Sequence, residues 1–452
     1  MPIELTKEYI ENIQKIIAEN DEKSAKKILK DLHPADIAEL YNELTVEEAK
    51  FLYLLLDGEI AADVLIELED DDREKFLEIL PGDLIAHQFI ENMDSDDAAD
   101  VIGELSEEKQ DEILKHISDV EQAGDIVDLL NYDENTAGGL MAKELITANE
   151  NWNIPTCLKE MRKQAQDIDE VYYVYVVNDD KKLLGILSLK KLLLSRPNSI
   201  IKNIYDENII SVDVNTPSEE IANLMDKYDL VALPVVDPIG RLVGRITIDD
   251  VVDVIREEAE KDYQMISGIT QDVETTDSAW ILTKARIPWL LIGLMGGILV
   301  ALVISRFEND IQINPQMAFF IPLIGAMAGN VGIQSSSIIV QAVATDNLGF
   351  ESTTQKLIKE FSVAFLNGII LAGIIFLYNF FLSDSFALTL TVSISLLSVI
   401  IFAAIFGTLI PLLLNKLEFD PAIATGPFIT TMNDIMGLFI YFIMGRILYG
   451  VF

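Results

Sequence analysis

The chain has 452 residues and a formal net charge of −41, from 74 acidic and 33 basic residues. Residues 1–286 hold 65 acids and 28 bases, a net of −37, whereas residues 287–452 hold nine acids and five bases, a net of −4. This contrast excludes a single soluble domain. It also argues against nucleic acid as a partner of the acidic part, because phosphate binding needs a basic surface. The single cysteine, Cys157, excludes a disulfide scaffold.

Residues 1–135 have a helical pattern throughout and contain an irregular repeat. The copies read DIAELYNEL at 36–44, AADVLIEL at 61–68 and AADVIGEL at 98–105, and each is followed by acids and then by an apolar stretch. Repeats of this kind are typical of stacked helical hairpins. We therefore expect an acidic, all-α N-terminal domain over residues 1–135.

A strand-like pattern begins at about Met141 and contains a second repeat. VYVVNDDKKLLGILSLKK (174–191) matches LPVVDPIGRLVGRITIDD (233–250) at an offset of 59 residues. Each copy reads as a strand, a turn, a second strand and the start of a helix, with a Ser or Thr suited to the helix cap. The pattern resembles paired CBS modules, a regulatory α/β fold. The resemblance implies one module over 136–200 and another over 201–258.

The segment 247–267 is predicted to be an acidic helix. Asp250, Asp253 and Glu257 share one face at spacings i, i+3 and i+7, where like charges repel. Two interpretations stay open: a solvated acidic helix, or a face that divalent cations bridge to acids elsewhere in the chain. Its continuation, a connecting helix over 259–284, leads to the apolar half of the chain.

Five long apolar stretches predict a transmembrane domain over residues 285–452. Each is close to or above the roughly 20 residues that cross a bilayer. They are Ile287–Ile304, Met317–Ala342, Phe361–Leu382, Phe386–Leu414 and Pro427–Phe452. The fold class is therefore a multi-domain membrane protein with an all-α N-terminal domain, α/β CBS modules, an acidic connecting helix and five membrane helices.

Basic residues near the ends of the spans predict the orientation. Five of them face one side if residues 1–286 are inside: Lys284, Arg286, Lys356, Lys359 and Lys416. Only Arg306 and Arg446 fall on the other side. The N-terminus also lacks an apolar run followed by a cleavage site, so it is not a signal peptide. We expect a multi-pass protein of the plasma (inner) membrane, with cytoplasmic N-terminal domains and the C-terminus outside.

Two of the spans are polar. The second carries Asn330, Gln334 and a run of serines among glycines, and the fifth carries Asp434, a costly group inside a bilayer. The small residues can also serve helix packing, and the serines can bond to neighbouring carbonyls. The membrane half has no Cys or His, which leaves carboxylate, amide, hydroxyl and carbonyl oxygens. This set favours a hard cation such as Mg²⁺ or Ca²⁺.

The order of these parts resembles the MgtE family of magnesium channels over essentially the whole chain. The most specific matches are GGLM (138–141), GNVGIQSS (329–336) and DPAIATGPFITTMNDIMG (420–437). The resemblance implies a homodimeric Mg²⁺ channel with passive influx and no enzymatic activity, embedded in the lipid bilayer. It implies that Asp434 is the pore carboxylate. The remaining ion-path candidates are Gly329, Asn330, Gln334, Thr430, Thr431 and Asn433.

The resemblance also implies gating by intracellular Mg²⁺, through ion bridges between the acidic domains. The candidate Mg²⁺ ligands are Glu219, Asp229, Asp250, Asp253, Glu258 and Asp262, with Asp96 and Asp100 on the helical domain. Two residues depart from the family pattern. Lys261 stands where an acid is expected and weakens one bridge, and Lys191 stands where some members have an aspartate for the ribose of ATP, which puts ATP binding in doubt.

Two other functions remain open. A secondary transporter coupled to Na⁺ or H⁺ is one, although the sequence offers neither a second acid or histidine within the spans nor an inverted repeat. A membrane-anchored nucleotide sensor without transport is the other, and it predicts that Asp434 is dispensable.

Overall fold

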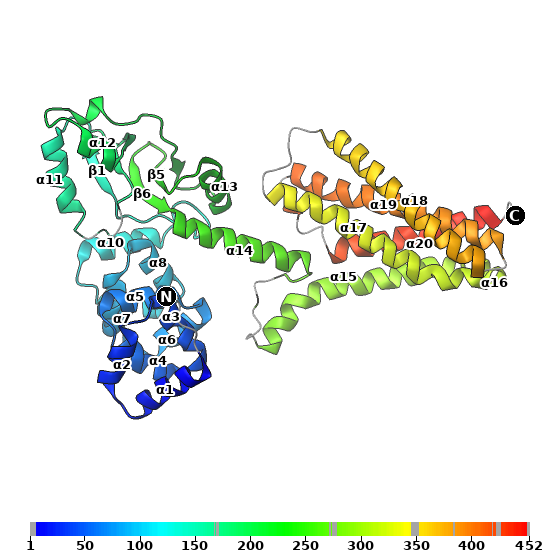
Figure 1. The fold of residues 1–452 in the computed structure, drawn as a ribbon, viewed down its shortest axis with the longest axis horizontal. Helices are drawn as coiled ribbons and strands as arrows, with labels where there is room; N and C mark the ends of the chain where they lie inside the picture. The colour runs from blue at the N-terminus through cyan, green and yellow to red at the C-terminus, as the bar shows by residue number, and fades with distance from the viewer. Residues whose placement is uncertain are drawn as a thin grey trace. The chain divides into compact units, whose positions relative to one another are not determined.

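The computed structural model describes residues 6–449 except 167, 169–170, 271–272, 274–277, 345–351, 383–384, 418 and 422–425. The chain forms two compact units, Met1–Ile255 and Arg256–Phe452 (Figure 1). The predicted fold class is confirmed: a helical N-terminal domain, two small α/β modules and long apolar helices follow one another along the chain.

The N-terminal domain of the first unit is built only of helices where the structure describes it. Its elements are α1 (Lys7–Ala18), α2 (Glu22–Leu29), α3 (Pro34–Glu39), η1 (Leu40–Glu43), α4 (Val46–Tyr53), α5 (Gly58–Ile66), α6 (Asp70–Glu78), α7 (Gly82–Gln88), η2 (Ile90–Asn92), α8 (Ser95–Gly103), α9 (Glu107–Leu114) and α10 (Val120–Leu129). The repeated motif falls on α3–η1, α5 and α8. Its apolar residues are buried, for example Val64 at 0% and Val101 at 1% exposure, which explains why the motif recurs.

One buried cation stabilises this domain. Arg73 of α6 is only 7% exposed. Its guanidinium donates hydrogen bonds to the carbonyl oxygens of Ile66 at 3.1 Å and Leu68 at 3.2 Å, and it pairs with the carboxylate of Glu104. All of these partners lie on neighbouring helices or turns, so Arg73 joins α5, α6 and the end of α8.

The two CBS modules have the same topology. Their elements are β1 (Ile146–Asn149), α11 (Ile154–Gln164), β2 (Val174–Val177), β3 (Leu183–Leu187), α12 (Leu189–Leu194), η3 (Ile201–Asn203), β4 (Val212–Asp213), α13 (Ser218–Tyr228), β5 (Ala232–Val236), β6 (Leu242–Thr247) and α14 (Ile248–Ile266). In each sheet the first pair of strands is parallel and the second is antiparallel. The bulges also correspond, at Val176/Val177 and Val235/Val236.

The repeated glycine of each module allows another segment to cross its sheet closely. A Cβ at Gly185 would lie 2.0 Å from the carbonyl oxygen of Asp206, and one at Gly244 would lie 2.8 Å from that of Ala142. Ala142 and Arg245 exchange backbone hydrogen bonds of 2.8 and 2.9 Å. The segment 136–142, which the sequence assigned to the first module, therefore pairs with the second module. Sequence order could not reveal this crossing, because the pairing partner is distant along the chain.

The N-terminal domain and the second module share one hydrophobic core. Buried side chains of the helical domain, of the segment 136–142 and of the second module belong to a single cluster that includes Val101, Met141 and Val251. The first module has a separate core around Val174, Val176 and Cys157. The first unit is therefore held together through its second CBS module.

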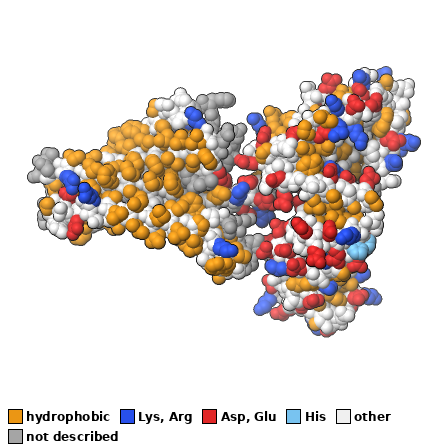
Figure 2. Space-filling model, turned by 180° about the vertical axis from the view of Figure 1, so that it is seen from behind, with side chains coloured by type: hydrophobic (Ala, Val, Ile, Leu, Met, Phe, Trp, Pro, Cys, Tyr) orange, Lys and Arg blue, Asp and Glu red, His pale blue; other side chains and the backbone are white. Residues whose placement is uncertain are grey.

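The second unit contains the end of α14 and the membrane helices. These are α15 (Ala279–Arg306), α16 (Glu308–Ile313), η4 (Pro315–Phe320), α17 (Ile321–Ala344), α18 (Thr353–Leu382), α19 (Phe386–Lys416) and α20 (Pro427–Tyr449). Within the described residues, five helices are long and apolar enough to cross a membrane, as the sequence predicted. Figure 2 shows apolar side chains covering the surface of this unit. Of the five, α19 has the largest buried share.

Several predicted boundaries differ from the structure. The predicted connecting helix over 259–284 is interrupted: α14 ends at Ile266 and α15 begins at Ala279. Gly268, with a φ of +81°, provides the left-handed turn that ends α14. The third span begins at Thr353 instead of Phe361, so it includes Glu360. Residues 450–452 of the predicted fifth span lie outside the described residues.

Candidate functional site

Two adjacent helices of the second unit, α17 and α20, surround the predicted pore carboxylate. A Cβ at Gly325 would lie 3.8 Å from Oδ1 of Asp434, and one at Gly329 would lie 3.6 Å from the same atom and 2.9 Å from Cγ2 of Thr430. Thr430 and Asp434 are one turn apart, so they occupy one face of α20. The glycines of α17 leave room for this face, and Oδ1 of Asp434 is buried without a hydrogen bond to a described residue.

The neighbouring residues of α20 make other contacts. Asn433 is fully buried and packs against Gly332 of α17. A Cβ at Gly332 would lie only 1.8 Å from Nδ2 of Asn433. Thr431 contacts α15, because a Cβ at Gly296 would lie 1.9 Å from Cγ2 of Thr431. The sequence grouped these residues with Asp434, and the structure places Asn433 against the same row of α17 glycines as Asp434 but turns Thr431 toward α15. A helix turns by about 100° per residue, so Thr431 and Asn433 point to nearly opposite sides.

The amides of the second span lie on another surface. Asn330 and Gln334 are exposed within the single chain, and so are Ala326 and Ile338. These four residues follow one another at intervals of four, which makes a continuous stripe along α17. The stripe is polar in its middle. The structure therefore brings Gly329, Thr430 and Asp434 together, but leaves Asn330 and Gln334 on the outer surface of the chain.

A second membrane carboxylate was missed by the sequence reasoning. The hydroxyl of Ser335, a residue that is 4% exposed on α17, donates a hydrogen bond of 2.6 Å to Oε1 of Glu360 on α18. The prediction that the spans hold no second acid is wrong for this reason. Glu360 directly precedes the apolar run, and a count of apolar residues placed it outside the span.

The end of α14 packs against the start of α20. A Cβ at Gly426, whose φ is +57°, would lie 2.4 Å from the carbonyl oxygen of Ile266, and one at Gly268 would lie 2.8 Å from Cγ of Pro427. The hydroxyl of Thr270 donates a hydrogen bond of 3.0 Å to the carbonyl of Ala285 on α15. The connecting segment thus contacts the first residues of the helix that carries Asp434.

Lys261 is paired on the same helix, α14. Its Nζ lies 3.1 Å from Oε1 of Glu258, and the carboxylates of Glu258, Asp420 and Asp262 raise the pKa of this lysine. Asp420 belongs to the loop before α20. The ammonium therefore occupies an acidic environment, and two of the predicted Mg²⁺ ligands, Glu258 and Asp262, contribute to it.

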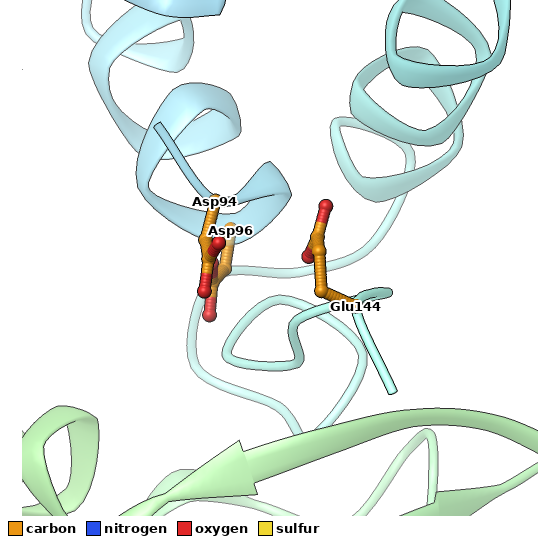
Figure 3. A group of neighbouring side chains, drawn as sticks. All are labelled: Asp94, Asp96 and Glu144. Atoms are coloured by element: carbon orange, nitrogen blue, oxygen red, sulfur yellow. The ribbon is translucent and has the colours of Figure 1, made fainter. Parts of the chain in front are cut away.

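A group of carboxylates lies in the first unit, where α8 meets the CBS region. Oxygens of Asp94, Asp96 and Glu144 lie within 4.8 Å of one another, and Figure 3 shows them gathered at the start of α8. Ser95 fixes the position of Glu144, because its hydroxyl donates a hydrogen bond of 2.8 Å to Oε2. Arg245 approaches Asp94 at 3.6 Å. Such oxygen donors suit Mg²⁺.

Charge repulsion is strong at this group. Burial and the neighbouring Asp250 hold the pKa of Asp96 well above its usual range. The same two causes raise the pKa of Asp97 to about 7. Burial raises the pKa of Asp250 to about 6, although Thr247 donates two hydrogen bonds to its carboxylate, at 2.9 and 2.7 Å. These acids need either protons or a cation to be buried together.

The other predicted ligands are spread more widely. Glu219 and Asp229 lie at opposite ends of α13 and are exposed. Asp100 is exposed on α8, and Asp253 is exposed on α14. Sequence reasoning missed Asp94, Asp97 and Glu144. Glu144 follows the GGLM motif, but nothing in its local sequence indicates that it faces α8.

Comparison with known proteins covers almost the whole chain. A model of the MgtE divalent cation transporter matches residues 321–444, one of the MgtE intracellular N domain matches 32–135, and the CBS domain model matches 137–197 and 201–257. The magnesium transporter MgtE of Thermus thermophilus is 31% identical, over 97% of this chain and 98% of that protein. Its counterpart in Bacillus subtilis is 30% identical, over 92% of each chain.

Solved structures resemble the cytosolic part. A crystal structure of the cytosolic domain of the Mg²⁺ channel MgtE in complex with ATP is 32% identical, with a TM-score of 0.51, and covers 54% of this chain and 99% of that one. The soluble part of a magnesium transporter is 28% identical, with a TM-score of 0.50, and covers 55% and 98%. The doubt about ATP that rested on Lys191 therefore has no support in these relatives.

Proposed function

Because the chain belongs to the MgtE family of magnesium transporters, we propose that it carries Mg²⁺ passively into the cell through its five-helix domain and catalyses no reaction. The observation that supports this most directly is Asp434, a carboxylate in a membrane helix with its Oδ1 facing the glycines of α17. Mg²⁺ gives up its bound water reluctantly and is usually held by few carboxylates. One acid with the nearby hydroxyl of Thr430 fits a hydrated ion.

The ion path is proposed to form between two copies of the chain. Asn330 and Gln334 form the polar middle of an exposed stripe on α17. An amide that faces lipid without a partner costs several kcal/mol. A second copy packed against this stripe would cover the amides or give them a water-filled path. The homodimer thus explains why these polar residues point out of the single chain.

Intracellular Mg²⁺ is proposed to close the path by binding between the acidic domains. The support is the carboxylate group at Asp94, Asp96 and Glu144, together with the raised pKa values of Asp97 and Asp250. Cations that bind only the compact arrangement favour it by mass action. The end of α14 rests on the first turn of α20, so movement of the acidic helix would reach Asp434 directly.

ATP is proposed as a further ligand of the CBS pair. The cytosolic domain that was solved with ATP is 32% identical to this chain, which supports the proposal despite Lys191. Isothermal titration of the purified protein with ATP tests it. Binding that is absent in the wild type would refute it.

The N-terminal domains are proposed to face the cytoplasm and the C-terminus to face outside. Cys157 is buried, so it gives little background in thiol labelling. A cysteine appended to the C-terminus should react with an impermeant maleimide in intact cells. Labelling only after permeabilisation would reverse the proposed orientation.

Mg²⁺ uptake by proteoliposomes tests the main proposal. Asp434→Ala should abolish uptake, and Asp434→Asn should reduce it strongly, because the charge at the path is lost. Asp310→Asn is the matched control. Asp310 pairs with Arg446 at the other end of α20 and has an exposed partner, so its loss should leave uptake nearly unchanged. Unchanged uptake in Asp434→Ala would refute the pore assignment and favour the nucleotide sensor.

An ion-coupled transporter is the second candidate, and Glu360 is the observation in its favour. Coupled carriers commonly use more than one membrane carboxylate, and Glu360 lies within α18. Reversal potentials in a bilayer distinguish the two mechanisms. A potential set by the Mg²⁺ gradient alone supports the channel, whereas Mg²⁺ movement against its own gradient would establish coupling.

A further inference from the structure

A buried arginine lies beside the carboxylate group of the first unit. Arg245, on β6, is only 6% exposed, and its Nη2 lies 3.6 Å from Oδ2 of Asp94 at the start of α8. Oxygens of Asp94, Asp96 and Glu144 lie within 4.8 Å of one another. A guanidinium in a protein keeps its positive charge at any physiological pH. A permanent cation therefore contacts the group that is proposed to bind Mg²⁺.

The backbone fixes the position of this arginine relative to the acids. Arg245 and Ala142 exchange backbone hydrogen bonds of 2.8 and 2.9 Å, and Ala142 is only two residues before Glu144. The same pairing thus brings the arginine and one of the carboxylates to the start of α8. Burial raises the pKa of Asp250 to about 6, and the hydrogen bonds from Thr247 and the charge of Arg245 oppose this rise. Arg245 therefore acts on acids of both α8 and α14.

The guanidinium also lies over an aromatic ring of the first CBS module. Its Cζ is 6.0 Å from the centroid of the Tyr172 ring, a distance at which a cation and a ring attract each other. Arg245 thus contacts a carboxylate of the helical domain and a ring of the first module at the same time. A guanidinium that a divalent ion displaces from Asp94 would keep this ring as a favourable neighbour.

Mg²⁺ and this guanidinium act on the same carboxylates. The number of ligand charges is one of the main factors that set the affinity of an oxygen site for a divalent cation, and Arg245 cancels one negative charge of the group. Two cations that are close together also repel each other more strongly inside a protein than in water. We propose that Arg245 is a built-in competitor of Mg²⁺ at this group, which lowers the Mg²⁺ affinity and so sets the Mg²⁺ level to which the group responds. The inference rests on the gating role proposed above and assigns its threshold to a residue outside the ligand set.

Hydrogen–deuterium exchange of α8 in the full-length protein, titrated with magnesium chloride, tests the competition. For an ion that binds only the closed arrangement, protection rises in proportion to 1 + [Mg²⁺]/Kd, so the protection without Mg²⁺ and the Kd are obtained separately. Arg245→Gln should lower the Kd at least about tenfold, because the site loses a nearby positive charge. It should also lower the protection without Mg²⁺, because the acids lose a counter-ion.

A purely structural role of Arg245 would give a different result. Loss of packing alone changes the protection without Mg²⁺ but leaves the Kd as it is, so an unchanged Kd in Arg245→Gln would refute the competition. Arg245→Lys keeps the positive charge, and its Kd should stay close to that of the wild type. A Kd in Arg245→Lys as low as in Arg245→Gln would also refute it. If Arg245→Gln does not fold, Arg245→Ile suits a strand position and should show the same fall in Kd.

The matched control removes the same charge from the same module. The exposed Arg241 pairs with Asp237 at 2.7 Å, and it precedes Arg245 by four residues, or about 13 Å along an extended chain. Arg241→Gln should leave the Kd unchanged, and an equal fall in this variant would refute a local effect.

The titration also separates this inference from the gating role on which it rests. If α8 of the wild type does not respond to Mg²⁺ but α8 of Arg245→Gln does, gating at this group fails and the competition stands. If neither protein responds, the competition is refuted as well. Mg²⁺ uptake by Asp434→Ala reports on the ion path independently of both.

Discussion

Protons and Mg²⁺ should compete at the acids of α8. Asp97 is half-buried, and burial together with Asp250 raises its pKa from 3.8 to about 7. Each pKa unit corresponds to about 1.36 kcal/mol, so ionisation of Asp97 opposes the folded arrangement by up to about 4 kcal/mol. Between about pH 4 and about pH 7 the folded state binds more protons than the unfolded state. Stability without Mg²⁺ should therefore fall as the pH rises through this range.

Hydrogen–deuterium exchange of the full-length protein measures this effect locally. In chelator, the protection of α8 amides, corrected for intrinsic exchange, should decrease between about pH 5 and about pH 7.5 by up to about a hundredfold. Millimolar Mg²⁺ should restore it at the higher pH, since a bound cation replaces the protons. Asp97→Asn should reduce the pH dependence, because the amide carries no charge.

The far helix α1 serves as the internal control. It lies at the other end of the helical domain (Figure 1) and should show neither the pH effect nor the Mg²⁺ effect. Equal protection of α8 at both pH values in chelator would refute the charge argument. A pH effect that Mg²⁺ does not reverse would refute Mg²⁺ binding at this group while leaving the repulsion in place.

Three further changes test other parts of the structure. Arg73→Met leaves the half-buried Glu104 without its partner, so it should destabilise the helical domain by about 1.5–3 kcal/mol in chemical denaturation, and a loss below about 1 kcal/mol would contradict the role given to this pair. Gly407→Ala should lower the thermal midpoint, because the added Cβ would lie 2.5 Å from the backbone oxygen of Gly332, at a cost of about 1–3 kcal/mol. In the control Gly297→Ala the added Cβ has no atom within 4 Å, so the thermal midpoint should stay unchanged. Lys261→Glu restores the expected acid and removes the ammonium that pairs with Glu258, so proteolytic protection of α14 should require less Mg²⁺, and an unchanged requirement would contradict the arrangement at this lysine.

The sequence was sufficient wherever a local pattern carried the information. The five apolar helices, the helical repeats and the two CBS modules follow from periodicity and composition, and the structure confirms them. It was less informative about boundaries. Glu360 was left outside its span because apolar counting stops at a charged residue, whereas the helix continues and Ser335 satisfies the carboxylate.

The contrast in charge between the two halves, −37 and −4, is a property of the sequence alone. Composition is enough to separate an acidic soluble part from an apolar part, because burial in a bilayer tolerates few charges. Which acids meet was decided only by tertiary structure, because Glu144 reaches Asp94 and Asp96 from a segment about 50 residues away in the chain. The motif around Asp434 shows the same limit. Its residues are consecutive in sequence, but helix rotation and the glycines of α15 and α17 determine that Thr431 faces α15 whereas Asp434 and Asn433 face α17.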